Sequence, residues 1–181
     1  IGTLIDDLVT KGTNEPYRIM TSRSEYRLLH RQDNADERLS AIGHRIGLVS
    51  DAQYAAVQEK YRAVAQEIRR LESSGIPESA ALNAMLTEKG TAAVKGSARL
   101  ADLVRQPQIA YDDLAPFDPE RPALPKAVRE AVEIQMKYAG YIARQQKQVE
   151  DFQREENRLL PPDADYAAIG GLRVEARQKL A

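Results

Sequence analysis

The clearest pattern of apolar and polar positions lies between residues 51 and 74. Apolar side chains recur there at alternating spacings of three and four: Tyr54, Val57, Tyr61, Val64, Ile68 and Leu71. This spacing places them on one face of a helix, as in the seam between two packed helices. Ser50 and Gln53 have the form of a capping box, which marks a helix start. We predict a helix here that packs against a partner helix.

A longer helix is predicted over residues 126–157, ended by Pro161 and Pro162. The same spacing runs through eight positions: Val128, Ala131, Gln135, Tyr138, Ile142, Gln145, Val149 and Phe152. At about 1.5 Å per residue this helix would be roughly 48 Å long. We therefore expect it to pack along the first long helix as a hairpin. Gly140 inside it indicates either a close helix crossing or a kink.

Shorter helices are predicted in the rest of the chain, at residues 25–32, 34–47, 81–86 and 97–105. Ser22 and Glu25 form a capping-box pattern before the first of them. Gly43 and Gly47 are typical helix-ending glycines. The fold class is therefore all-α: a helical domain with a long-helix hairpin, preceded by a short irregular and helical N-terminal segment.

A proline-rich connector, residues 107–125, joins the shorter helices to the long one. It holds three overlapping P-x-x-P patterns, which occur in ligands of SH3-type domains. Because that pattern is weak, we interpret the connector as a stiff linker. We divide the chain into an N-terminal segment 1–50, a helical domain 51–160 and the start of a further helical unit at 161–181.

Composition limits the possible chemistry. The 181 residues include no Cys and two His, with a formal net charge of −1. Disulfide scaffolds, Cys-ligated metals and thiol catalysis are therefore excluded, and any binding to nucleic acid must rest on a local patch. No apolar run approaches the ~20 residues of a membrane span. The chain starts at Ile1 without a signal peptide pattern, so we expect a fragment of a longer, cytoplasmic protein.

Motifs for catalysis are missing. No G-x-G-x-x-G is present, and residues 90–97 differ from a phosphate-binding P-loop because Lys95 precedes Gly96. His30 and His44 have no second ligand nearby in the sequence, so no metal site is predicted. Adjacent helical carboxylates point about 100° apart, so we interpret the pairs Asp6–Asp7 and Asp112–Asp113 as solvated charges. No catalytic residue is predicted.

Residues 11–45 carry an Arg-rich cluster with seven basic side chains against five acidic ones. The basic residues are Lys11, Arg18, Arg23, Arg27, Arg31, Arg38 and Arg45. Arg23, Arg27 and Arg31 recur every four residues, on one face of the predicted helix. Arginine suits bidentate phosphate contacts, and the interleaved Tyr17, Tyr26 and His30 could stack on unpaired bases. Two interpretations stay open: a phosphate- or RNA-binding face, and a solvated face with internal Arg–Glu pairs.

Three stretches of this chain resemble the GidA (MnmG) family. They are LIDDLVTKGTNEPYRIMTSRSEYRLLHRQDNADERLSAIGHRIGLV from Leu4, VEIQMKYAGYIARQQKQVEDFQREEN from Val132, and LLPPDADYAAIGGL from Leu159. Ser24, His30 and Gln32 stand where the family usually has Ala, Leu and Glu. These departures leave the arginines unchanged. The family's N-terminal FAD domain and its Gly-rich loop are absent from this sequence.

The resemblance implies a place in the flavin-dependent subunit that modifies carbon five of the wobble uridine in tRNA. That enzyme is a homodimer that uses FAD, NADH and methylenetetrahydrofolate and works with the GTPase MnmE. Its C-terminal helical region is associated with tRNA and with the GTPase. The resemblance carries tRNA contact to Arg18, Arg23, Arg27 and Arg31, and more weakly to Lys11. Tyr17 or Tyr26 would stack a base or pack internally.

By this resemblance the fragment alone would be inactive, because the flavin site lies elsewhere. An alternative from another class is a purely structural helical arm that serves dimerisation or partner docking without touching RNA.

Overall fold

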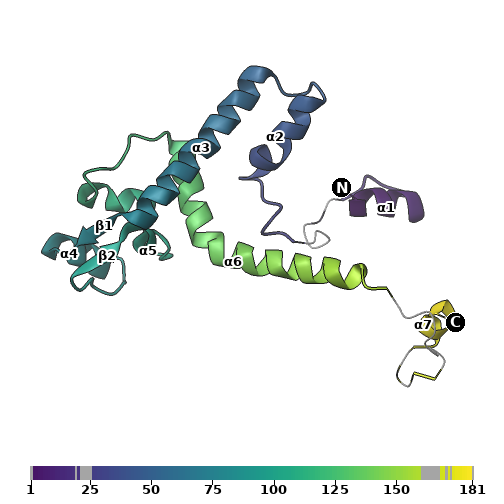
Figure 1. Ribbon diagram of the computed structural model, residues 1–181. Coiled ribbons are helices and arrows are strands. Elements are labelled where there is room, and N and C mark those ends of the chain that lie inside the picture. Colours follow the sequence, from purple (N-terminus) through teal and green to yellow (C-terminus); the bar gives the residue numbers. More distant parts are fainter. Residues whose placement is uncertain are drawn as a thin grey trace. The chain divides into compact units, whose positions relative to one another are not determined.

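The computed structural model describes residues 2–18, 20, 26–159, 168–169, 171 and 173–180 (Figure 1). Its contacts divide the chain into two units, Ile1–Gln145 and Gln146–Ala181. The described elements are α1 Gly2–Thr10, α2 Ala35–Arg45, α3 Asp51–Ser73, β1 Gly75–Pro77, α4 Ala80–Glu88, β2 Ser97–Arg99, α5 Leu100–Val104, the 3-10 helix η2 Tyr111–Phe117, α6 Lys126–Glu156 and α7 Val174–Leu180. The predicted all-α class is confirmed, with two short strands as the only described sheet.

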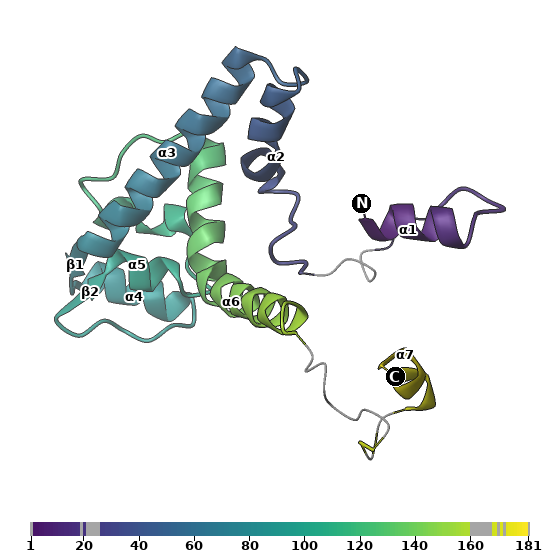
Figure 2. The ribbon, with the colours of Figure 1, turned by 45° about the vertical axis from the view of Figure 1, so that its right-hand side comes forward.

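Helix α3 begins as the sequence predicts. The Ser50 hydroxyl accepts the Gln53 amide, and the Gln53 side chain accepts the Ser50 amide. The seam is confirmed too, since Val64 and Leu71 are buried and its other members are half-buried. Helix α2 lies alongside the first half of α3 in both views (Figures 1 and 2). The seam thus packs on α2 at one end and on the core at the other.

Of the two glycines predicted to end α2, one is confirmed and the other is wrong. Gly47 has a φ of +79° and follows the helix, as a helix-ending glycine does. Gly43 instead lies inside α2, where a Cβ would come within 2.7 Å of the Val49 Cγ2 atom. Glycine is needed there because the chain folds back closely onto the helix.

The core gathers apolar side chains from helices, strands and connector alike. Its buried members are Val64, Leu71, Ile76, Leu82, Leu86, Leu100, Ala101, Leu103, Val104, Ile109, Tyr111, Leu114, Val128, Val132 and Met136. Strands β1 and β2 pair antiparallel, with Ile76 opposite Ala98. Residues 97–99 were predicted as helix. They form a strand because Gly96, at a φ of +76°, turns the chain back beside β1, and α5 begins only after it.

The connector 107–125 is part of this core, so its interpretation as a stiff linker is wrong. Ile109, Tyr111 and Leu114 are at most 3% exposed. Pro116 lies inside η2 rather than in an extended segment. The connector therefore packs as a structural element between α3 and α6.

A buried polar network fastens the connector to α3. The Arg70 guanidinium donates to Glu67 at 2.7 and 2.9 Å and to Asp118 at 2.6 and 3.0 Å. The Tyr111 hydroxyl donates to Glu67 at 2.7 Å. The hydrogen bonds that Arg70 donates raise its pKa above the ordinary value. The bond to Glu67 has the larger effect and the bond to Asp118 the smaller one. Burial and the bond to Glu67 raise the pKa of Tyr111 to about 12.

Helix α6 is buried only along its first turns, at Val128, Val132 and Met136. These side chains belong to the same core cluster as Val64 and Leu71 of α3, so the two long helices meet at this core. The predicted packing of one along the other as a hairpin is wrong, because α3 packs mainly against α2, α5 and β2. Beyond the core the predicted seam opens, and Tyr138 is 41% exposed. A Cβ at Gly140 would meet nothing within 4 Å, so this glycine marks no close helix crossing. No helix in the described ranges is long and apolar enough to cross a membrane.

Candidate nucleic-acid interface

The first group of predicted site residues surrounds Asp7 at the end of α1. Asp7 is only 4% exposed. Its carboxylate accepts Lys11 Nζ at 2.9 Å and the Tyr17 hydroxyl at 2.6 Å. The interpretation of Asp7 as a solvated charge is therefore wrong. The buried carboxylate makes Lys11 and Tyr17 anchors of the loop that follows α1.

Arg18 ends this loop and is exposed. It lines a shallow hollow with the loop residues from Gly12 onward. No ion pair to Arg18 occurs within the described ranges. Arg23, the next predicted contact, lies outside the described residues.

The second group lies in a turn, residues 26–31, where the sequence predicted a helix. Tyr26 has a φ of +52°, in the left-handed region that a right-handed helix cannot use. Its carbonyl accepts the amides of Leu29 at 2.9 Å and His30 at 3.3 Å. The predicted helix is therefore wrong over residues 26–31, and Arg27 and Arg31 do not share a helix face.

The side chain of Asn34 closes this turn. Its amide oxygen accepts the Arg31 backbone amide at 3.1 Å, and its nitrogen donates to the Leu29 carbonyl at 3.1 Å. The same oxygen accepts Arg38 Nε at 3.0 Å. Asn34 precedes α2 without capping it. Its side chain stabilises the turn instead.

The turn is also held by α6. The Leu29 amide donates to Gln145 Oε1 at 3.2 Å. Arg31 is only 15% exposed, because its Nε donates to Asp33 Oδ1 at 3.0 Å and its guanidinium lies 5.9 Å from the centre of the Tyr138 ring. Arg31 also donates to the Leu28 carbonyl. The guanidinium of Arg31 is thus largely occupied by contacts within the molecule.

Arg27 has the opposite surroundings. It lies in the middle of the same turn with an exposed side chain, and no acid pairs with it in the described ranges. Tyr26, beside it, is half-buried. Among the predicted contacts that the structure describes, Arg18 and Arg27 therefore present open guanidinium groups, and Lys11 and Arg31 are ion-paired. None of these contacts is tested, so each stays a prediction.

The sequence interpretation missed an aromatic pair on α6. Tyr138 and Tyr141 are 41% and 59% exposed, with ring centres 6.4 Å apart. Tyr138 was predicted as a seam residue. A signal was present, because residues 134–149 carry three basic side chains and no acid.

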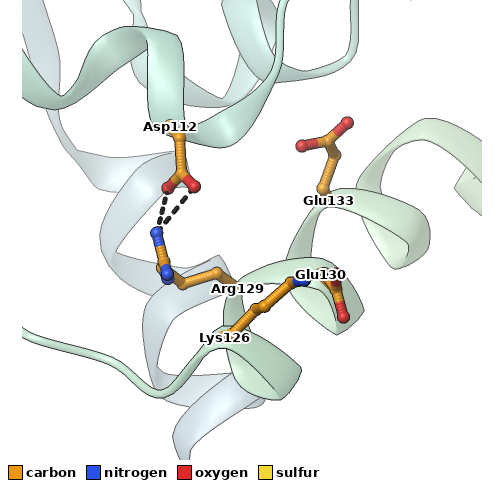
Figure 3. A pocket seen from close by; sticks show the side chains of 5 residues that line it. All are labelled: Asp112, Lys126, Arg129, Glu130 and Glu133. Atoms are coloured by element: carbon orange, nitrogen blue, oxygen red, sulfur yellow. Dashed lines mark hydrogen bonds and ion pairs between the residues drawn. The ribbon is translucent and has the colours of Figure 1, made fainter.

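Another charged cluster joins η2 to the start of α6 around a small hollow of about 110 Å³ (Figure 3). Asp112 accepts Arg129 at 2.6 and 2.7 Å, and also Arg121. Partial burial would raise the pKa of Asp112, but these hydrogen bonds hold it below its ordinary value. Glu133 accepts the Tyr111 amide at 2.9 Å.

These contacts show that Asp112 is ion-paired. Asp113 likewise binds Lys89 at 2.9 Å. The interpretation of these two adjacent carboxylates as solvated charges is therefore wrong, because their ion pairs fasten the connector. The hollow beside them is far smaller than a usual ligand pocket. No metal-ligand cluster occurs in the part of the chain that the structure describes.

Two family models match the chain. Residues 51–146 match the "tRNA modifying enzyme MnmG/GidA C-terminal helical domain", and residues 148–181 match the "tRNA modifying enzyme MnmG/GidA C-terminal helical bundle". Curated relatives named tRNA uridine 5-carboxymethylaminomethyl modification enzyme MnmG are similar over 99% of the chain. Identity is 51% for the protein of Caldicellulosiruptor saccharolyticus and 49% for that of Bacillus subtilis.

The chain spans only 29% of the length of these relatives. Among solved structures, it is similar to Aquifex aeolicus GidA in the form II crystal. The TM-score is 0.67 at 40% identity, covering 99% of this chain and 28% of that one.

Proposed function

Since the chain belongs to the MnmG/GidA family of tRNA-modifying enzymes, as part of its C-terminal helical region, we propose that it binds tRNA through the open cations of residues 11–31. The observation that carries the proposal is Arg27, an exposed guanidinium with no acidic partner in the described ranges. The hydrogen bonds of Asn34 and Gln145 hold its turn in place. A preorganised, unpaired arginine suits a phosphate contact, because little ordering is required on binding.

In this proposal the phosphate contacts position the tRNA, and the modification of its wobble uridine takes place elsewhere in the longer enzyme. Arg18, Arg23 and Arg27 would make these contacts. Arg31 and Lys11, which are ion-paired within the chain, would have a supporting role. The tRNA substrate also implies a cytoplasmic location.

The flavin of the family does not fit the described residues of this chain. A hollow between α2 and α3 is lined by apolar residues such as Leu39, Leu48 and Val49. Its one carboxylate, Asp36, is bound to Lys60 and Tyr61. A dinucleotide needs amide donors for its pyrophosphate, and no Gly-rich loop supplies them here. We assign FAD, NADH and methylenetetrahydrofolate to the remainder of the longer enzyme.

A second candidate function is docking of a protein, either the GTPase MnmE or a second copy in a homodimer. The favouring observation is an apolar stripe that faces solvent along α2 and its C-cap residue. Leu39, Ile42 and Ile46 follow helical spacing and are 47–60% exposed. Exposed stripes of this kind are typical of protein interfaces. This function could accompany tRNA binding or, as a structural arm, replace it.

The experiment that tests tRNA binding measures fluorescence polarisation of a labelled tRNA transcript against salt, using the 181-residue chain. We expect the double variant Arg18→Gln/Arg27→Gln to bind more weakly and to lower the log–log salt slope by about 1.5, because each phosphate contact contributes roughly 0.7–0.9. The matched control is Arg62→Gln/Arg69→Gln, two exposed arginines of α3. Absence of binding at low salt would leave the docking arm as the function.

A further inference from the structure

Tyr138 and Tyr141 are open to solvent on a helix whose first turns are buried in the core. Their exposed fractions are 41% and 59%, and their rings meet at a tilt of 55°. Aromatic rings usually contribute their large surface to a core or to an interface. Two neighbouring rings left this exposed therefore suggest a surface that receives another ring.

The turn 26–31 runs beside these tyrosines. It is attached to α6 at Tyr138, through the Arg31 guanidinium, and at Gln145, through the Leu29 amide. Tyr138 and Gln145 are two helical turns apart, and Tyr141 lies between them on the same side of α6. The tertiary structure thus brings the Arg-rich turn and the aromatic pair into one surface.

Cations border this surface. Arg144 follows Tyr141 by three residues, which places it next to the ring on the helix. Its side chain is exposed, and it has no ion pair in the described ranges. Arg27 is exposed on the adjoining turn. The turn 26–31 contains no acid, and Asp33, which follows it, is bound to Arg31. Open cations beside an open ring are the combination that single-stranded nucleic acid requires.

We infer that Tyr141, positioned by Tyr138, is a stacking platform for an unpaired base of the tRNA, and that Arg27 and Arg144 contact the flanking phosphates. This inference rests on the proposed function and adds to it the kind of RNA that is bound. Bases in a duplex are already stacked on each other, so the platform selects loops or ends rather than stems. Arg31 covers part of Tyr138, which leaves the more exposed Tyr141 as the stacking residue.

A fluorescence experiment tests stacking directly, because the chain contains no Trp. The Tyr141→Trp variant has a single indole at the proposed platform. We expect its emission to be quenched by unmodified tRNA transcript and by single-stranded oligouridine, and not by a duplex RNA of equal length. The Phe152→Trp variant is the control, since Phe152 is 49% exposed on the same helix. Its emission should not change.

Affinity separates stacking from charge. Tyr141→Ala should weaken tRNA binding about tenfold without changing the salt slope, and Tyr141→Phe should keep the affinity of the original chain. Arg144→Gln should lower the salt slope by about one, and Arg62→Gln should leave it unchanged. Far-UV circular dichroism checks that each variant keeps its helices.

Three results would overturn the inference and are distinguishable from one another. If Arg18→Gln/Arg27→Gln weakens binding but Tyr141→Ala does not, tRNA binding stands and the stacking platform is wrong. If the original chain does not bind tRNA even at low salt, the proposed function fails together with the platform. Equal quenching of the indole by duplex RNA would also contradict base stacking.

Discussion

The backbone amide of Leu29 donates to the side-chain oxygen of Gln145 at 3.2 Å, across 116 positions of the chain. This bond attaches the Arg-rich turn to α6. The same amide also donates to Tyr26, so the turn has local support as well. The position of Arg27 relative to α6 therefore depends on this distant glutamine as well as on the contact between Arg31 and Tyr138.

Replacing Gln145 should loosen this turn without unfolding the helical domain. In Gln145→Ala the Leu29 amide loses one acceptor, and a hydrogen bond of this type contributes about 1 kcal/mol. We expect faster amide hydrogen exchange at Leu29 and Arg31, measured by NMR, with unchanged exchange at Leu86 in the core. Gln148→Ala, an exposed glutamine of the same helix, is the control. Unchanged exchange at Leu29 would show that the local bonds alone hold the turn.

The buried network around Arg70 should dominate the stability of the connector. Arg70→Ala leaves the carboxylates of Glu67 and Asp118, which are 2% and 6% exposed, without their shared cation. Breaking a buried ion pair costs about 3–5 kcal/mol. We expect a loss of that size in urea unfolding, against about 1 kcal/mol for Tyr111→Phe. Arg69→Ala, one position away and exposed, should change little. An equal effect at Arg69 would contradict the network's importance.

Two glycines in helices should respond to alanine in opposite directions. At Gly140 a Cβ meets nothing within 4 Å, so Gly140→Ala should stabilise by about 1 kcal/mol through helix propensity. At Gly43 the new Cβ meets Val49 Cγ2 at 2.7 Å, and overpacking costs about 1–3 kcal/mol. We therefore expect a net loss in thermal unfolding. Adding Val49→Ala should recover part of it, and stabilisation by both alanines would disprove the close contact.

Acid should weaken the contact between α2 and α3. Partial burial would raise the pKa of Asp36, but hydrogen bonds from Lys60 and Tyr61 hold it below its ordinary 3.8. Because the pKa of Asp36 is lowered in the folded state, its contribution to stability is complete above a pH of about 4. That contribution is lost as the pH falls through the pKa of the folded state.

Burial, and after it the negative charge of Asp36, raises the pKa of Glu37. The pH dependence of stability that Glu37 contributes is therefore opposite in sign to that of Asp36. Asp36→Asn should therefore flatten the acid side of the stability curve, measured by urea unfolding between pH 2 and 7. Asp102→Asn, at an exposed pair on α5, is the control. An unchanged acid limb in Asp36→Asn would contradict the role of this bond.

The turn that carries Arg27 and Arg31 could not be predicted from the sequence. The predicted helix face with Arg27 and Arg31 assumed that four-residue spacing persists through residues 26–31. Tyr26 enters the left-handed region instead, and the Asn34 side chain bonds to the turn without capping the backbone amides of α2. Arg31 was equal to Arg27 in the sequence, yet Asp33 and Tyr138 enclose only one of them. Spacing alone could not distinguish the two.

The sequence by itself determined the all-helical class, the start of α3 at its capping box and the two long helices. Each of these depends on residues within a few positions of one another, so local hydrogen bonding and periodicity are sufficient. Only the tertiary structure decided that the proline-rich connector enters the core, that Arg27 stays open, and that Tyr141 faces solvent. Those outcomes depend on partners far along the chain, such as Asp118 for Arg70 and Gln145 for Leu29, and only folding brings them within bonding distance.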